Sequence, residues 1–118
     1  MTDLSSVDLS GDDVVVARVS GEIDMSNSVE LGEELATAVP NSALGLVIDL
    51  TATAYLDSSG VHLIFDLAER LRQRQQQLRV VVPEGAPIRR VLRIVELDQS
   101  VPVLSAVDEA VAQIRAEA

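Results

Sequence analysis

The sequence predicts a single α/β domain that spans residues 1–118. Short apolar segments alternate with amphipathic segments of helical period, which is the pattern of strand, helix and strand units. Two β-branched segments precede this alternation and indicate a hairpin. A hydrophobic content of 47% in 118 residues is enough for one sizeable core.

The predicted hairpin joins a strand at residues 7–9 to a strand at residues 14–19. Between them stands Ser10-Gly11-Asp12-Asp13, a turn cluster of the kind that connects antiparallel strands. We expect a loop at residues 20–24.

A first helix is predicted after this loop, because Ser26 or Asn27 can act as its N-cap. Apolar residues recur with helical spacing from there, and Pro40 ends the pattern. The predicted buried stripe consists of Val29, Leu31, Leu35, Ala38 and Val39.

The middle of the chain predicts a strand at residues 44–50, a helix from Ser58 to about Gln76, and a strand at residues 78–83. The first of these strands is a continuous apolar run, which is typical of a central strand covered on both faces. A helix between two neighbouring strands implies parallel pairing and a right-handed connection.

The remaining segments predict a helix, a short strand and a final helix. Pro87 suits a first helical position, and the outer face of its helix carries Arg89, Arg90 and Arg93. A strand at residues 101–104 contains Pro102, which suits only a sheet edge. Ser105 and Asp108 resemble a capping box for a last helix at residues 106–115.

Composition excludes several classes of function. A formal net charge of −10 and an aromatic content of 2% disfavour nucleic acid, because its recognition needs basic surfaces and aromatic stacking. The chain has no Cys and one His, so we expect no metal site and no disulfide. Without a signal sequence or an apolar run of about 20 residues, we expect a cytoplasmic protein that does not enter a membrane.

The most informative segment is Asp57-Ser58-Ser59-Gly60, which lies where the central strand passes through a short loop into a helix. The start of a helix leaves backbone N–H groups without partners, so it accepts a capping side chain or a phosphate. These hydroxyls can therefore be caps, nucleophiles or sites of a switch. Both lie in the first turn, so chemistry alone does not choose between Ser58 and Ser59.

The same helix has two distinct faces. At about 100° per residue, one side gathers Gly60, Leu63, Ile64, Leu67, Ala68 and Leu71 and is expected to face the sheet. The other side carries Ser58, His62, Phe65, Asp66, Glu69 and Gln73. The ring of Phe65 can either fold onto a neighbouring helix or anchor a partner.

A serine hydrolase using Ser58, His62 and Asp66 is conceivable, because the three lie one turn apart on that polar side. However, the Gly-x-Ser-x-Gly elbow is absent, since Leu56 stands where its first Gly would be. We therefore expect no catalytic residue and a solvated surface role for His62.

Two motifs resemble those of a known family. Leu56-Asp57-Ser58-Ser59-Gly60 follows an apolar strand that ends in Asp49-Leu50, and Gly21-Glu22-Ile23-Asp24 follows the second strand. These residues, the chain length and the order of elements resemble the STAS domains, and most closely the bacterial anti-sigma-factor antagonists. The resemblance implies a mixed four- or five-stranded sheet with about four helices packed mainly on one side, and no enzymatic activity.

The resemblance also implies a mechanism. Ser58 would be phosphorylated by an anti-sigma-factor serine kinase that uses ATP, so the chain itself needs no cofactor. Unphosphorylated, such a monomer captures the kinase and frees the sigma factor, and a phosphatase reverses the modification. The residues expected at the partner surface are Asp24, Asp57, Ser59, Gly60, Val61, His62 and Phe65.

One departure from the family pattern is Gly60-Val61-His62, where many relatives have Gly-Leu-Gly. The larger, titratable His62 either changes the choice of partner or abolishes cycling. A different class of function is also open, in which the chain is an accessory or scaffold subunit of a larger complex of stressosome or lipid-transport type.

Overall fold

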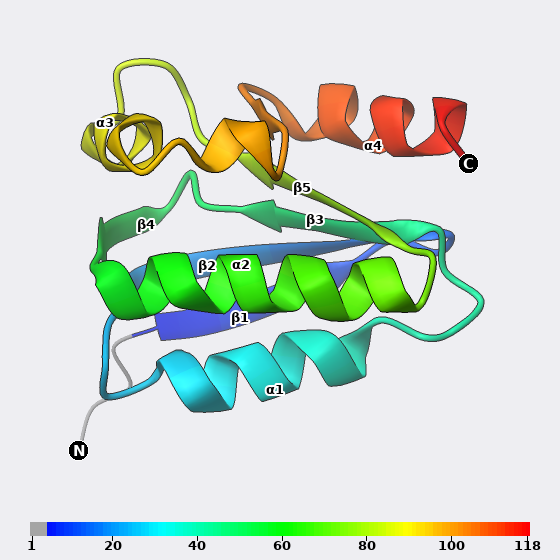
Figure 1. Ribbon diagram of the computed structural model, residues 1–118, viewed down its shortest axis with the longest axis horizontal. Helices are drawn as coiled ribbons and strands as arrows, with labels where there is room; N and C mark the ends of the chain where they lie inside the picture. Colours follow the sequence, from blue (N-terminus) through cyan, green and yellow to red (C-terminus); the bar gives the residue numbers. More distant parts are fainter. Residues whose placement is uncertain (1–4) are drawn as a thin grey trace.

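The computed structural model describes residues 5–118, and Figure 1 shows their path. Six strands and four helices follow one another, together with one short 3₁₀ helix. In chain order they are β1 (Ser5–Ser10), β2 (Val14–Ile23), α1 (Ser28–Ala38), β3 (Gly45–Asp49), β4 (Thr53–Leu56), α2 (Ser58–Gln73), β5 (Gln77–Val81), α3 (Pro87–Ile94), η1 (Leu97–Gln99), β6 (Val103–Leu104) and α4 (Val107–Ala116).

The sheet is mixed, as expected, with strands in the order β1-β2-β3-β5-β6. Strand β1 is antiparallel to β2, and the other pairs are parallel. All residues of β3 are buried, which confirms the predicted central strand. Strand β6 lies at the edge, immediately after Pro102.

The sheet has six strands instead of four or five, because β4 was expected to be a loop. Residues 53–56 pair in parallel with the end of β2, so Glu22 lies opposite Tyr55 and Ile23 opposite Leu56. Strand β2 is correspondingly longer than predicted and includes most of the expected loop at residues 20–24. Gly21 has a φ of 95° and adjoins a register shift, which is where glycine suits a bulge.

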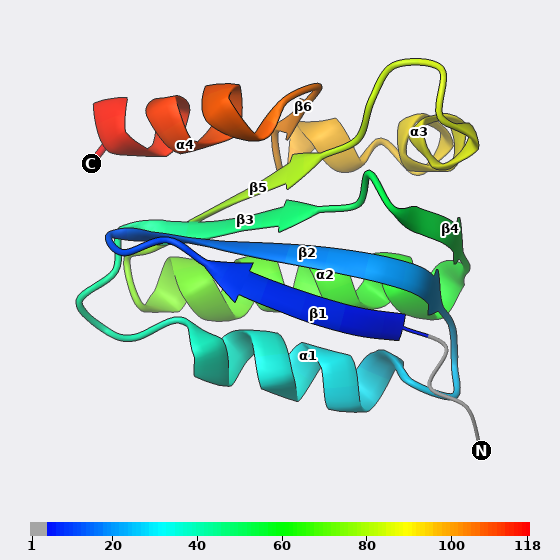
Figure 2. The ribbon, with the colours of Figure 1, turned by 180° about the vertical axis from the view of Figure 1, so that it is seen from behind.

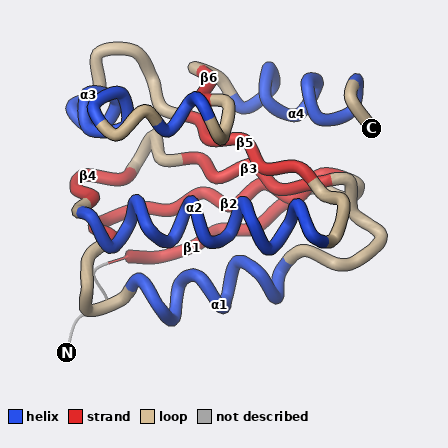
Figure 3. The backbone as a smooth tube through the Cα atoms, viewed as in Figure 1, coloured by secondary structure: helices blue, strands red, loops and turns tan. Residues whose placement is uncertain are grey.

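The helices form two unequal layers (Figures 1 and 2). Helices α1 and α2 lie in front of the sheet in Figure 1 and behind it in Figure 2, and α3 adds Ile88 and Leu92 to the same large apolar cluster. Helix α4 packs Ala110 and Ile114 against a smaller cluster with β2, β3 and β5. Three of the four helices of residues 5–118 therefore share the larger cluster, as expected, and Figure 3 shows all four around the strands.

Helix α1 differs in detail from the prediction. Leu31 and Leu35 are buried, but Val29 is 77% exposed, so it does not belong to the buried stripe. The N-cap position is Asn27, whose side chain makes no capping hydrogen bond. The capping box predicted before α4 is also absent, because Ala106 holds the N-cap position without a side-chain bond.

Helix α2 buries the predicted face against the sheet, apart from Ala68, which is half-buried. It ends at Gln73, three residues before the predicted end. Gln75 then adopts a φ of 61°, and the buried Gln76 side chain donates to the carbonyl oxygens of Pro40 at 2.8 Å and Ala43 at 3.0 Å. This left-handed turn redirects the chain into β5.

Candidate functional site

Asp57 caps the start of α2. Its carboxylate oxygen Oδ1 accepts hydrogen bonds from the backbone N–H of Ser59 at 2.8 Å and of Gly60 at 3.3 Å. The Asp57 carbonyl oxygen accepts from the Val61 N–H at 3.1 Å. The capping role that the sequence allows at this motif thus belongs to Asp57, and neither serine performs it.

Ser58 is the first residue of α2, and its side chain is exposed. Within residues 5–118 its hydroxyl has no hydrogen-bonding partner, so nothing there competes for it. Ser59 is half-buried. The exposure difference favours Ser58 over Ser59 as the hydroxyl that another protein can reach.

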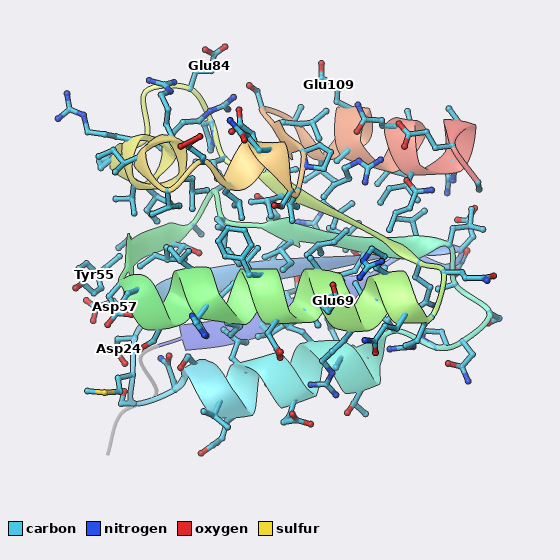
Figure 4. The ribbon with its side chains drawn as sticks, viewed as in Figure 1. Asp24, Tyr55, Asp57, Glu69, Glu84 and Glu109 are labelled. Atoms are coloured by element: carbon cyan, nitrogen blue, oxygen red, sulfur yellow. The ribbon has the colours of Figure 1, made fainter. Side chains whose placement is uncertain are left out.

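The paired ends of β2 and β4 bring Asp24 and Asp57 to the same edge of the sheet. The Asp57 backbone N–H donates to the carbonyl oxygen of Ile23 at 3.2 Å, so the end of β4 is hydrogen-bonded to the end of β2. Asp24 directly follows β2, and Asp57 directly follows β4. Figure 4 shows Asp24, Tyr55 and Asp57 together at this end of the molecule. Ser58 therefore begins its helix in an acidic neighbourhood.

The loop after β2 is held by its own polar groups. Asp24 Oδ1 accepts from the Ser26 N–H at 2.9 Å and from the Ser26 hydroxyl at 2.6 Å. Asn27 accepts from the Asp24 N–H at 3.0 Å and donates to the Glu22 carbonyl oxygen at 2.8 Å. This Asx-type arrangement fixes the loop beside α2.

A groove of about 410 Å³ runs between α1 and α2. Its lining includes Ser58, Ser59, His62 and Asp66 from α2, and Val29 and Glu33 from α1. At its far end the Arg70 guanidinium bridges the two helices by pairing with Glu33 at 3.0 Å. Ser58 therefore lies at the end of the groove away from Arg70, and the acidic side chains in the groove lining are Glu33 and Asp66.

Two residues expected at the partner surface lie beneath it. Gly60 and Val61 are buried. A Cβ built on Gly60 would lie 2.7 Å from Leu56 Cγ and 3.1 Å from Ile23 Cγ2, so this glycine lets α2 approach the strands closely. Both residues pack beneath the surface around Ser58 and present no side chain on it.

Phe65 lies on the other flank of α2. Its ring is half-buried against the main apolar cluster, and it lines a second hollow with Ala68, Leu78 and Val101. The ring thus packs on the apolar cluster near β5 and the segment after η1, whereas the sequence allowed a ring folded onto a neighbouring helix. The ring does not line the groove that contains Ser58.

Three apolar side chains near the start of α2 are exposed, which the sequence does not predict. Met25 follows Asp24 and is 81% exposed, Tyr55 precedes Asp57 by two residues and is 51% exposed, and Val29 lines the groove. We call Met25, Val29 and Tyr55 the apolar rim. Sequence alone does not distinguish an exposed Val or Tyr from a buried one. The β2–β4 pairing brings Met25 and Tyr55 to one end of the sheet, and Val29 lines the groove that contains Ser58.

The stripe of Ser58, His62 and Asp66 shows no hydrogen bond between its members. A nucleophile needs a base within hydrogen-bonding reach, and this stripe does not provide that contact. Within the described part of the chain, no group of three His, Asp or Glu side chains could hold a metal ion.

The model of the STAS domain family matches residues 1–110. The chain belongs to the STAS domain family. Anti-sigma-F factor antagonist RsfB of Mycobacterium tuberculosis is 29% identical over 102 residues, which cover 86% of this chain and 82% of RsfB. The anti-sigma-B factor antagonist of Listeria monocytogenes is 37% identical over 60 residues, which cover 51% of this chain and 53% of that protein.

Solved structures agree with this membership. An anti-sigma factor antagonist from Mycobacterium paratuberculosis matches with a TM-score of 0.80 and 32% identity, covering 94% of this STAS chain and 92% of its own. Unphosphorylated SpoIIAA matches with a TM-score of 0.74 over 95% of this chain and 96% of its own, and its 19% identity shows the fold alone. Among residues 5–118, no helix is long and apolar enough to cross a bilayer.

Proposed function

We propose that this STAS domain is an anti-sigma-factor antagonist that binds an anti-sigma-factor serine kinase and is released when Ser58 is phosphorylated. The observation that carries the proposal is the exposed Ser58 hydroxyl at the start of α2, free of hydrogen bonds to residues 5–118 and next to the capping carboxylate of Asp57. The antagonist names of its relatives point to the same role.

The docking face in this proposal is the end of the α1/α2 groove at which Ser58 lies. The apolar rim supplies surface whose burial drives association, at roughly 25 cal/mol per Å² of apolar area. Asp24, Ser59 and His62 surround Ser58 with polar groups that fix the orientation of the partner. Phe65 faces away from this groove, so its contact with a partner would require a second area of interface.

Phosphorylation opposes docking for an electrostatic reason. A phosphate on Ser58 adds about −1.5 to −2 charges, and Asp57 already occupies the N–H groups of Ser59 and Gly60. In a complex this charge would be desolvated beside a carboxylate, which costs about 2–5 kcal/mol. A loss of that size weakens binding more than tenfold, at about 1.4 kcal/mol per factor of ten.

The kinase supplies ATP, and a phosphatase acting on phosphorylated Ser58 restores binding. The chain is then a substrate of both enzymes and performs no chemistry of its own. SpoIIAA, which shares the fold, has been solved in unphosphorylated and phosphorylated forms. The proposal gives this chain the same pair of states.

The test is phosphorylation by a candidate anti-sigma-factor kinase and ATP, followed by mapping of the modified peptide. Label on Ser58 that disappears in Ser58→Ala and persists in Ser59→Ala supports the proposal. Label on Ser59, or no label with any kinase that binds the chain, contradicts it.

A switch needs one reversible interface, so we propose that the free protein is a monomer. Size-exclusion chromatography with light scattering tests this directly. A stable large assembly of the purified chain would instead favour the scaffold or accessory-subunit function.

A further inference from the structure

Most backbone N–H groups in the first turn of α2 already donate hydrogen bonds, so few are available to a phosphate. Asp57 takes the N–H groups of Ser59 and Gly60 through its carboxylate, and its carbonyl takes the Val61 N–H. A free helix start would hold an anion with these donors. Here a phosphate on Ser58 must find its counter-charge on a side chain.

The arginines near α2 are engaged elsewhere. Arg70 is the arginine that lines the α1/α2 groove, but it pairs with Glu33 at 3.0 Å. It also lies twelve residues beyond Ser58, about 18 Å along the helix at 1.5 Å per residue. Among residues 5–118, the arginines with neither an ion pair nor a side-chain hydrogen bond are Arg90 and Arg93, which belong to α3 and do not line this groove.

His62 meets the requirements for this counter-charge. It follows Ser58 by four residues, and the two line the same groove from one face of α2. Side chains on a helix lean towards its N-terminus, so an imidazole at this position can reach the turn that carries Ser58. It is exposed, so it can rotate to meet a new charge.

Resting on the proposed phosphorylation of Ser58, we propose that His62 is the positioning residue that pairs with the Ser58 phosphate in its cationic form. The pairing then depends on pH, because the imidazole must be cationic. Opposite charges at this spacing stabilise a helix, and a phosphate carries more charge than a carboxylate.

Other charged groups face His62 and set the background. Asp66 lies one turn further along α2, Glu33 faces it from α1 but is held by Arg70, and Asp57 caps the helix before Ser58. These groups are present with or without the phosphate. The difference in the His62 titration between the phosphorylated and unphosphorylated proteins therefore reports the effect of the phosphate alone.

The sign of the effect follows from the two titrations. A cationic imidazole is favoured by a neighbouring phosphate, so the pairing is complete at mildly acidic pH and is lost as the pH rises and the imidazole becomes neutral. The phosphate loses its second charge below about pH 6. Pairing should therefore be strongest at about pH 6 to 7.

The test uses His62 as its own probe, because the chain contains one histidine. Phosphoserine is incorporated at position 58 during synthesis, so no kinase is needed. The carbon-bound ring protons of His62 are then followed by NMR from pH 5 to 8. The matched control carries phosphoserine at Ser42, an exposed residue between α1 and β3. It reproduces the added net charge away from His62.

We expect the midpoint of the imidazole titration to rise by about half a pH unit or more with phosphoserine at 58, and by much less with phosphoserine at 42. The ³¹P titration of the Ser58 phosphate should move in the opposite direction, to lower pH, and this shift should vanish in His62→Gln. Equal midpoints in the two phosphorylated forms would overturn the pairing. Failure of the proposed function would appear separately, as absence of kinase labelling.

Discussion

The backbone N–H of Asp57 donates to the carbonyl oxygen of Ile23 at 3.2 Å. This bond extends the β2–β4 pairing by one step and aligns two strand ends that are far apart in the sequence. Asp24 and Asp57 follow those ends, so one backbone contact brings both residues to the edge of the sheet at which α2 begins. The surface around Ser58 thus depends on strand pairing as much as on its own motif.

Replacing Gly60 by Ala should destabilise the fold by about 1–3 kcal/mol, because the new methyl group overpacks the start of α2. Its Cβ would lie 2.7 Å from Leu56 Cγ and 3.1 Å from Ile23 Cγ2. Urea unfolding measures the loss. Gly32→Ala is the matched control, since its Cβ would meet Leu63 at an ordinary 3.6 Å. That variant should be neutral or more stable, and equal losses in the two would refute the packing role of Gly60.

Asp57→Ala should cost about 1 kcal/mol of stability by removing the cap of α2. Asp57→Asn keeps an oxygen that can accept from the N–H groups of Ser59 and Gly60, so it should lose only a few tenths of that. Chemical denaturation of the three proteins separates these cases. If Asn and Ala prove equally damaging, the carboxylate acts through its charge and not as a cap.

Tyr55→Ser should weaken binding to an anti-sigma-factor kinase by about tenfold or more without lowering stability, because an exposed aromatic side chain in an interface often contributes over 1 kcal/mol. Leu9→Ser is the control, since Leu9 is similarly exposed but lies on β1 opposite Ala17, away from the β2–β4 pairing. Calorimetric titration of both variants decides the question. Comparable losses would mean that the apolar rim has no special role.

Acid should weaken the ion pair between Asp13, in the β1–β2 hairpin, and Arg115 of α4. The Arg115 guanidinium donates to Asp13 Oδ1 at 2.8 Å and lowers the pKa of that carboxyl below its ordinary value. A lowered pKa means that the contribution is present above the pKa of unfolded Asp and is lost as the pH falls through the folded value. Asp13→Asn should therefore differ from the parent in urea midpoint near pH 6, and the difference should shrink as the pH falls below the ordinary pKa of Asp. A difference that persists unchanged at pH 3 would contradict the assignment.

The hydrophobic pattern of the sequence predicts an element correctly where that element is buried on one face or on both. The continuous apolar run of β3 and the two faces of α2 are both predictable. Their buried positions are apolar, and these positions recur with the period of the element. The Asp57-Ser58 motif likewise marked a helix start from local chemistry alone. These segments needed no knowledge of distant residues.

The remaining features depend on long-range contacts. The middle two residues of β4 are exposed, so its sequence carries no clear period, and its pairing is set by the bulge at Gly21. Val29 fits a helical stripe as well as Leu31 does, but the position of α2 decides which of them is buried. The apolar rim could not be predicted for the same reason.

The central claim is that charge on Ser58 controls docking while the fold stays intact. The most direct measurement is the calorimetric affinity of an anti-sigma-factor kinase for the parent protein, for Ser58→Ala and for the form carrying phosphoserine at 58. We predict that the parent and Ser58→Ala bind alike, and that phosphoserine weakens binding more than tenfold without lowering the urea midpoint. Equal affinity of all three forms would contradict the account.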